Sequence, residues 1–206
     1  MKQLIGAIEG LLMAAALTGG DTKESVKFAL KSVKWRSKLT EPSPLSQPVV
    51  DLQLDAACAV TGQYGSNSHM IVDEIQKAKD LLHWESAYQD RDDEPDIASL
   101  TRNFAYTTLI GPGAPLHSDK VAAGLSLQGR DTYYPPHAHQ AVEGYWIVGG
   151  DGDWKVGAEP WFPVKAGSSI FHDTGVRHAM QSNAEPLLTV WMWTSHLESE
   201  IVIVRG

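Results

Sequence analysis

Cysteine is nearly absent from this chain: Cys58 is the only one in 206 residues. A single thiol cannot form a disulfide within the chain, and it cannot build a cysteine metal cluster. The fold must therefore depend on a hydrophobic core, for which the chain is long enough. The shortage of cysteine also predicts a reducing cytoplasm as the location.

Basic residues and long apolar runs are scarce as well. Lys and Arg number 17 against 25 Asp and Glu, for a net charge of -8. Nucleic-acid binding needs clustered positive charge, so a nucleic-acid partner is excluded. No uninterrupted apolar run reaches the roughly 18 residues of a membrane helix, so no membrane partner is expected. The apolar start contains Glu9 and has only Lys2 as positive charge, which favours a mature helix over a cleaved leader.

The first part of the chain is predicted to be helical. Apolar residues from Leu4 to Ala15 recur at spacings of three and four, and residues 68–84 keep the same period. Residues 49–60 are ambiguous between helix and strand. The charged run 89–96 marks a boundary, so we expect a helical segment over 1–95 and a β-domain over 96–206.

The second part changes to short apolar runs separated by Gly and Pro. Closely spaced strands with such turns predict a sandwich or small barrel, so the expected fold class is mainly β with preceding α-helices. The predicted strands are 100–110, 121–127, 142–148, 154–156, 169–171, 187–193 and 201–204.

A candidate metal site lies in residues 133–150. His137, His139, Glu143 and Tyr145 all occupy odd positions, so wherever the backbone is extended their side chains point to one face. Two imidazoles and a carboxylate suit a divalent first-row ion such as zinc, iron, manganese or cobalt. A fourth ligand is expected from elsewhere in the chain.

The spacing resembles the cupin signatures. His137-x-His139-x3-Glu143-x6-Gly150 is similar to the first cupin motif, and Gly175-x2-His178 is similar to the core of the second. This resemblance implies a small antiparallel barrel, or jelly roll, in which His137, His139, Glu143 and His178 hold one divalent ion. The other histidines, His172 among them, show no partner spacing and are assigned no role.

The flanking residues narrow the resemblance. Tyr133-Tyr134, Glu143-x-Tyr145 and Trp191-x-Trp193 resemble the cupin-type dimethylsulfoniopropionate (DMSP) lyases of marine bacteria. The resemblance implies a carbon–sulfur lyase that releases dimethyl sulfide and acrylate from DMSP.

The same resemblance suggests a role for each aromatic residue. Tyr145, as phenolate, removes the α-proton, and Tyr134 or its neighbour Tyr133 supplies a second phenol at the mouth. Trp191 and Trp193 share a strand face and are candidates to bind the sulfonium. Trp146 has the opposite parity to Tyr145, so it is expected outside the barrel, against the helices.

Two other functions are compatible with the ligand spacing alone. An iron dioxygenase would use the same ligands, and a non-catalytic cupin would only bind a small molecule. The helical segment either covers the barrel or forms the contact of a homodimer, and the sequence leaves both open.

Overall fold

The computed structural model describes residues 1–18, 20–59, 66–88 and 94–205. The charged run expected to mark the boundary lies largely outside these residues, since 89–93 are not described. Among the described helices, none is both long enough and apolar enough to cross a membrane.

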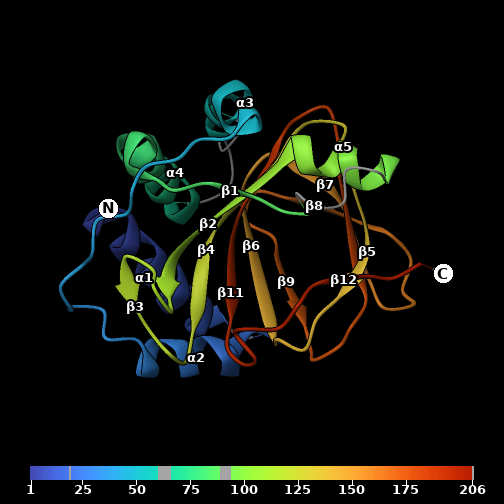
Figure 1. The fold of residues 1–206 in the computed structure, drawn as a ribbon. Helices are drawn as coiled ribbons and strands as arrows, with labels where there is room; N and C mark the ends of the chain where they lie inside the picture. The colour runs from blue at the N-terminus through green and yellow to red at the C-terminus, as the bar shows by residue number, and fades with distance from the viewer. Residues whose placement is uncertain (19, 60–65, 89–93, 206) are drawn as a thin grey trace.

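Helices α1 to α4 form a layer on one side of the molecule (Figure 1). They are α1 (Lys2–Thr18), α2 (Lys23–Ser32), α3 (Pro48–Ala59) and α4 (Ser66–Ala78), which a 3₁₀ turn, Lys79–Leu81, continues. Each buries an apolar stripe; in α1 the buried side chains are Leu4, Ile5, Ile8, Leu11 and Leu12. The ambiguous stretch 49–60 is thus mostly helical.

The larger sheet runs down the middle of the molecule. Its strand order is β1-β2-β4-β11-β6-β9, with β3 added in parallel to β2. The strands are β1 (Glu85–Ser86), β2 (Phe104–Gly111), β3 (Leu116–His117), β4 (Ala122–Gln128), β6 (Glu143–Gly149), β9 (Ser169–His172) and β11 (Leu187–Trp193).

The smaller sheet faces the larger one on the side away from α1–α4 (Figure 1). Its order is β12-β5-β10-β7-β8, with antiparallel pairing throughout. The strands are β5 (Tyr133–Ala138), β7 (Asp151–Val156), β8 (Phe162–Lys165), β10 (His178–Ser182) and β12 (Val202–Ile203). Two facing sheets behind a helical layer confirm the expected fold class, a jelly roll preceded by helices.

Two apolar clusters hold these layers together. One joins the helices to the outer face of the larger sheet, and the other fills the space between the sheets. Trp146 belongs to the first cluster and Tyr145 to the second, which confirms the parity prediction for both residues. The larger sheet is therefore buried on both faces. Side chains on its inner face lie in the space between the two sheets.

The structure corrects the predicted strand 100–110. Residues Pro95–Asn103 form helix α5, and β2 begins only at Phe104. Pro95 starts the helix because proline is well tolerated in the first turn, and Ile97 and Leu100 bury their side chains in the inter-sheet cluster.

Strand β5 was not among the predicted strands, and it contains Pro135 and Pro136, which are unfavourable in a paired strand. In the structure the pairing of β5 with β10 shifts register between His178 and Met180. Such an irregularity leaves room for residues that cannot donate to the ladder. The two prolines therefore lie inside a strand that has neighbours on both sides.

Candidate metal centre

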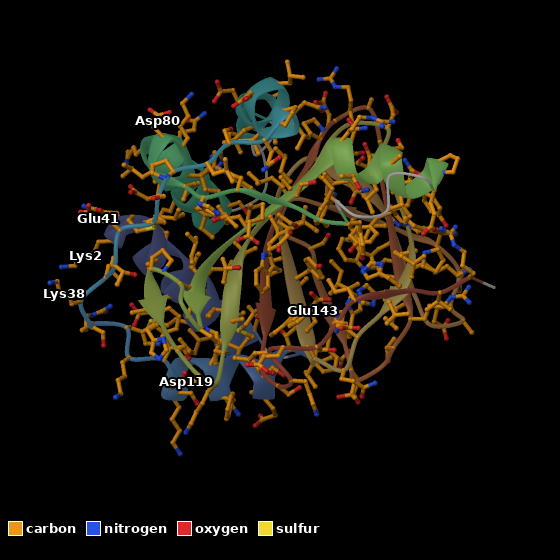
Figure 2. The ribbon with its side chains drawn as sticks, viewed as in Figure 1. Lys2, Lys38, Glu41, Asp80, Asp119 and Glu143 are labelled. Carbon is orange, nitrogen blue, oxygen red and sulfur yellow. The ribbon has the colours of Figure 1, made fainter. Side chains whose placement is uncertain are left out.

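Glu143 occupies the centre of a row of side chains that crosses three strands. Its register partner on β11 is Trp193, and its register partner on β9 is His172. Trp193 Nε1 donates to Glu143 Oε1 at 2.6 Å, and His172 Nδ1 lies 3.1 Å from Oε2. Glu143 is only 2% exposed; Figure 2 shows it inside the molecule, while the other labelled charged residues lie at the periphery. A carboxylate buried to this degree requires partners.

Three imidazoles approach Glu143 from the smaller sheet and the turn that follows β5. His137 on β5 and His178 on β10 are register partners, and His139 lies one residue beyond the end of β5. All three are buried. The site is thus assembled between the two sheets, whereas the sequence pattern alone suggested one face of an extended segment.

Each of these imidazoles has its Nδ1 proton committed to the backbone. His137 Nδ1 lies 2.9 Å from the Pro135 carbonyl, His139 Nδ1 lies 3.0 Å from that of Ala141, and His178 Nδ1 lies 2.9 Å from that of Val176. A carbonyl oxygen only accepts hydrogen bonds, so each Nδ1 must carry a proton. In the neutral rings every Nε2 then presents a lone pair, and this is the arrangement found around histidine ligands of metals.

The Nε2 lone pairs converge on a carboxylate oxygen. Glu143 Oε2 lies 3.1 Å from His139 Nε2 and 3.4 Å from His178 Nε2, and the latter nitrogen is buried without a hydrogen-bond partner among the described residues. Two groups that both offer lone pairs approach this closely only if a proton or a cation lies between them. The donor atoms of His139, Glu143 and His178 all lie within 4.8 Å of one another, so they fit one divalent ion.

The electrostatics of the cluster favour an ionised Glu143 beside a neutral His137. Burial alone would raise the pKa of Glu143, but the neighbouring imidazoles of His139, His172 and His178 hold it well below its ordinary value. Burial, followed by the neighbouring His178, lowers the pKa of His137 well below its ordinary value. A carboxylate and neutral imidazoles are the protonation states that bind metals.

His137 lies beside this compact set and is not a member of it. Its ring centroid is 4.1 Å from that of His178 and 4.0 Å from that of Tyr134, on which it stacks. The structure therefore brings three of the four predicted ligands together and places the fourth next to them.

Sequence reasoning missed His172. The residue is fully buried, and its ring stacks on His178 with centroids 3.7 Å apart. Burial, followed by His178, lowers the pKa of His172 to about 4. No local motif contains it, because it meets Glu143 only through the pairing of β9 with β6.

Two phenols lie in the inter-sheet cluster close to the imidazoles. Tyr145 has its ring centroid 5.8 Å from that of His172, and burial followed by the Glu143 carboxylate raises its pKa well above the ordinary value. Tyr134 donates to or accepts from the hydroxyl of Tyr88 at 2.6 Å, and burial followed by Tyr88 raises its pKa as well. Tyr88, which sequence reasoning also missed, has a φ of 61°, an uncommon value for a residue other than glycine.

The remaining predicted site residues differ in position. Tyr133 is 43% exposed and its ring lies beside Trp161, whereas its neighbour Tyr134 is buried against His137. Trp191 and Trp193 both point between the sheets; their ring centroids are 6.1 Å apart and both are partly exposed. Trp193 stacks obliquely on His139 at 4.6 Å, so a partly exposed indole covers one of the candidate metal ligands.

Comparison with known protein families gives one match that covers most of the chain. A family model described as dimethylsulfoniopropionate lyase matches residues 22–189. The chain is 32% identical over 106 residues to the DMSP lyase DddQ of Ruegeria pomeroyi, which is 52% of this chain and 53% of that protein. It is 30% identical over 119 residues to a putative DMSP lyase, DddL, of Cereibacter sphaeroides, which is 57% of this chain and 47% of that protein. The chain thus spans about half the length of the curated relatives it matches.

Solved structures of DMSP lyases share the fold. The crystal structure of DddQ from Ruegeria pomeroyi superposes with a TM-score of 0.72 at 24% identity and covers 98% of this chain and 96% of that chain. A structure from work on the DMSP lyases RdDddP and RnDddQII gives a TM-score of 0.76 at 20% identity, with coverages of 98% and 96%. At these identities the likeness shows the fold alone.

Proposed function

This chain belongs to the dimethylsulfoniopropionate lyase family, whose model spans residues 22–189, and we propose that it is a metal-dependent lyase that cleaves DMSP to dimethyl sulfide and acrylate. The observation that carries the proposal is the set of buried imidazoles that direct unprotonated Nε2 atoms toward the Glu143 carboxylate. Membership of the family is the basis for proposing DMSP as the substrate. The cluster is the basis for proposing a metal site that binds the carboxylate end of DMSP.

We assign His139, Glu143 and His178 as ligands, with His137 beside them as the fourth. A divalent transition ion in this site, whether zinc, iron, manganese or cobalt, would supply a positive charge that receives the substrate carboxylate and increases the acidity of the adjacent C–H bond. The buried position of the ligands keeps that charge from being screened by water.

Tyr145 is the proposed acceptor of the α-proton, in the phenolate form that a divalent ion bound beside it would favour over the neutral phenol. It follows Glu143 by two residues on β6, so its side chain enters the same space between the sheets. The electron pair of the α-C–H bond forms the new double bond of acrylate, and the pair of the β-carbon–sulfur bond leaves with dimethyl sulfide. No oxidant or reductant is needed for this elimination. Tyr134, stacked on His137, places a second phenol in the same inter-sheet cluster.

Trp191 is the proposed contact for the sulfonium. The Nε1 of Trp193 is occupied by Glu143, and its ring covers His139. Trp191 instead donates its Nε1–H to the Leu125 carbonyl at 3.1 Å, which fixes a partly exposed indole in the inner space. An aromatic face attracts a cation electrostatically. Tyr133, predicted to bind substrate from the sequence, would contact DMSP only at the outer surface.

The test is headspace gas chromatography of the purified chain, stripped of metal and reloaded separately with each of the four ions, with DMSP as substrate. We expect dimethyl sulfide and acrylate in equal amounts. Tyr145→Phe should lower kcat by about 100-fold or more, because the proton acceptor is lost. His117→Ala is the control, since His117 is an exposed histidine paired with Asp119.

The outcomes separate the parts of the proposal. Metal-loaded protein that yields no dimethyl sulfide would refute the substrate, and oxygen uptake in its place would indicate a dioxygenase. Full activity of Tyr145→Phe would refute the role of that tyrosine and leave the substrate assignment intact.

A further inference from the structure

His172 differs from His139 and His178 in having a side-chain N–H donor at its Nε2. Its Nε2 lies 3.0 Å from Trp154 Nε1, and its Nδ1 lies 3.1 Å from Glu143 Oε2. In His139 and His178 the Nε2 atoms face the Glu143 carboxylate and the Nδ1 atoms are tied to the backbone. His172 therefore has no lone pair to give to an ion.

The contacts of His172 determine its tautomer. An indole N–H can only donate, so Trp154 requires an unprotonated Nε2 on His172. The ionised Glu143 can only accept, so it requires a proton on Nδ1. One neutral tautomer, with the proton on Nδ1, satisfies both contacts. Trp154 and His172 are each fully buried, so water does not compete for either hydrogen bond.

The same contacts fix the carboxylate. Trp193 donates to Oε1 and His172 donates to Oε2, and the two residues lie in register on the strands on either side of Glu143. With a donor on each oxygen the carboxyl group cannot rotate freely. Oε2 keeps its remaining lone pair directed toward His139 and His178.

We propose that His172, held in one tautomer by Trp154, is a positioning residue that orients Glu143 for metal binding. It acts through Glu143 and does not touch the ion or the substrate. The proposal rests on the metal-binding part of the proposed function, and it is independent of which substrate the ion receives. Hydrogen-bonded partners of metal ligands commonly alter metal affinity by about 10- to 100-fold.

Two amide substitutions separate the two contacts of His172. In His172→Asn the side-chain amide occupies the place of Nδ1, so it can still donate to Glu143. In His172→Gln the amide reaches the place of Nε2, so it faces Trp154 and leaves Glu143 without this donor. Trp154→Phe keeps the aromatic ring but removes the N–H that selects the tautomer.

The measurement is metal affinity of the full chain by competition with a zinc chelator, together with thermal unfolding of the metal-free proteins. We expect His172→Asn to stay within about threefold of the parent chain and His172→Gln to bind zinc about 10- to 100-fold more weakly. Equal affinities of the Asn and Gln variants would overturn the proposal, because a merely structural role does not distinguish them.

A second measurement uses the unmodified chain and does not depend on any variant folding. Nitrogen-15 NMR of labelled histidine reports which ring nitrogen carries the proton in the metal-free protein. We expect a neutral His172 protonated on Nδ1, and a mixed population in Trp154→Phe. Protonation of His172 on Nε2 in the parent chain would overturn the proposal.

Failure of the proposed DMSP lyase activity and failure of the proposed role of His172 give different results. If the parent chain binds zinc but releases no dimethyl sulfide from DMSP, the substrate assignment fails and the role of His172 is still decided by the Asn and Gln variants. If the parent chain binds none of the four ions, the metal site and the positioning role are both refuted.

Discussion

The hydroxyl groups of Tyr88 and Tyr134 lie 2.6 Å apart, and this hydrogen bond connects the segment that follows β1 to the strand that bears His137. Tyr134 also stacks on the His137 ring. Loss of the Tyr88 hydroxyl should therefore alter the position of the Tyr134 ring, which contacts the His137 imidazole. Thr101 of helix α5 donates to the Tyr88 carbonyl, which helps to hold the unusual backbone conformation of that residue.

Tyr88→Phe is expected to lower kcat/KM for DMSP by about 3- to 10-fold, which corresponds to the loss of one neutral hydrogen bond. The fold should be retained, because phenylalanine preserves the aromatic packing. The measurement is a double-mutant cycle with Tyr134→Phe. If the two phenols act as a unit, Tyr88→Phe will have little further effect once Tyr134 is phenylalanine. Strict additivity would show that they act separately.

The candidate metal ligands could be predicted because they lie in local motifs, while the residues that contact them could not. His137, His139 and Glu143 fall within seven residues, and Gly175-x2-His178 spans only four. His172 and Trp193 meet Glu143 only because β9 and β11 both pair with β6. Strand order and register depend on the packing of the whole sheet, so a single sequence does not reveal them.

Elements of the fold were likewise predicted where a local pattern is long and regular, and missed where it is short. Helix α1 has a regular apolar period over its whole length, and it was predicted. The last part of helix α5, residues 100–103, was assigned to a strand because the helical and strand periods cannot be told apart on so short a segment. The cytoplasmic location remains a prediction, and the homodimer remains one of the two roles that the sequence left open for the helical segment.

Loss of a ligand should remove the metal. His139→Ala and His178→Ala are expected to retain little of it after purification, since each removes one donor from a compact set of three. His137→Ala should weaken binding less, because its ring lies beside that set. Elemental analysis measures the stoichiometry, and the exposed His117→Ala is the matched control. One equivalent of metal in His139→Ala would remove this residue from the ligand set.

The two inner tryptophans should have separable effects. Trp193→Phe removes the donor to Glu143 Oε1 and should weaken metal binding by about 10-fold or more, because a hydrogen bond to a buried charge is lost. Trp191→Leu should leave metal affinity unchanged and raise KM for DMSP by about fivefold through loss of the aromatic face. Trp191→Phe, which keeps a face, is the control. A raised KM of equal size in both Trp191 variants would argue against a sulfonium contact.

Cys58 should be unreactive in the folded protein. It is 3% exposed on α3, and burial followed by Asp55 raises its pKa from 9.0 to about 12. Since the thiolate is the reactive form, alkylation at pH 8 should be slower than in the unfolded chain by about 1000-fold. The neutral thiol is favoured in the fold, so its contribution to stability is complete below pH 9.0 and is lost as the pH rises toward about 12. Mass spectrometry with and without denaturant measures the reaction; equal rates would contradict a buried thiol.

Gly124 allows β4 to approach β2 at the point where their register shifts. A Cβ at this position would lie 1.8 Å from the Thr107 carbonyl oxygen and 3.1 Å from the Thr108 Cα, which are both backbone atoms and cannot swing away. Gly124→Ala should therefore force the two strands apart and destabilise the protein by about 3 kcal/mol or more.

The matched control for Gly124→Ala is Gly6→Ala on α1, where a Cβ would meet nothing within 4 Å. That change should stabilise the protein by up to about 1 kcal/mol, because alanine is the better helix former. Urea unfolding followed by circular dichroism measures both variants. Similar urea midpoints for the two variants would mean that β2 and β4 can separate without loss of stability. The larger sheet would then not be the rigid support that the row Trp193, Glu143 and His172 requires.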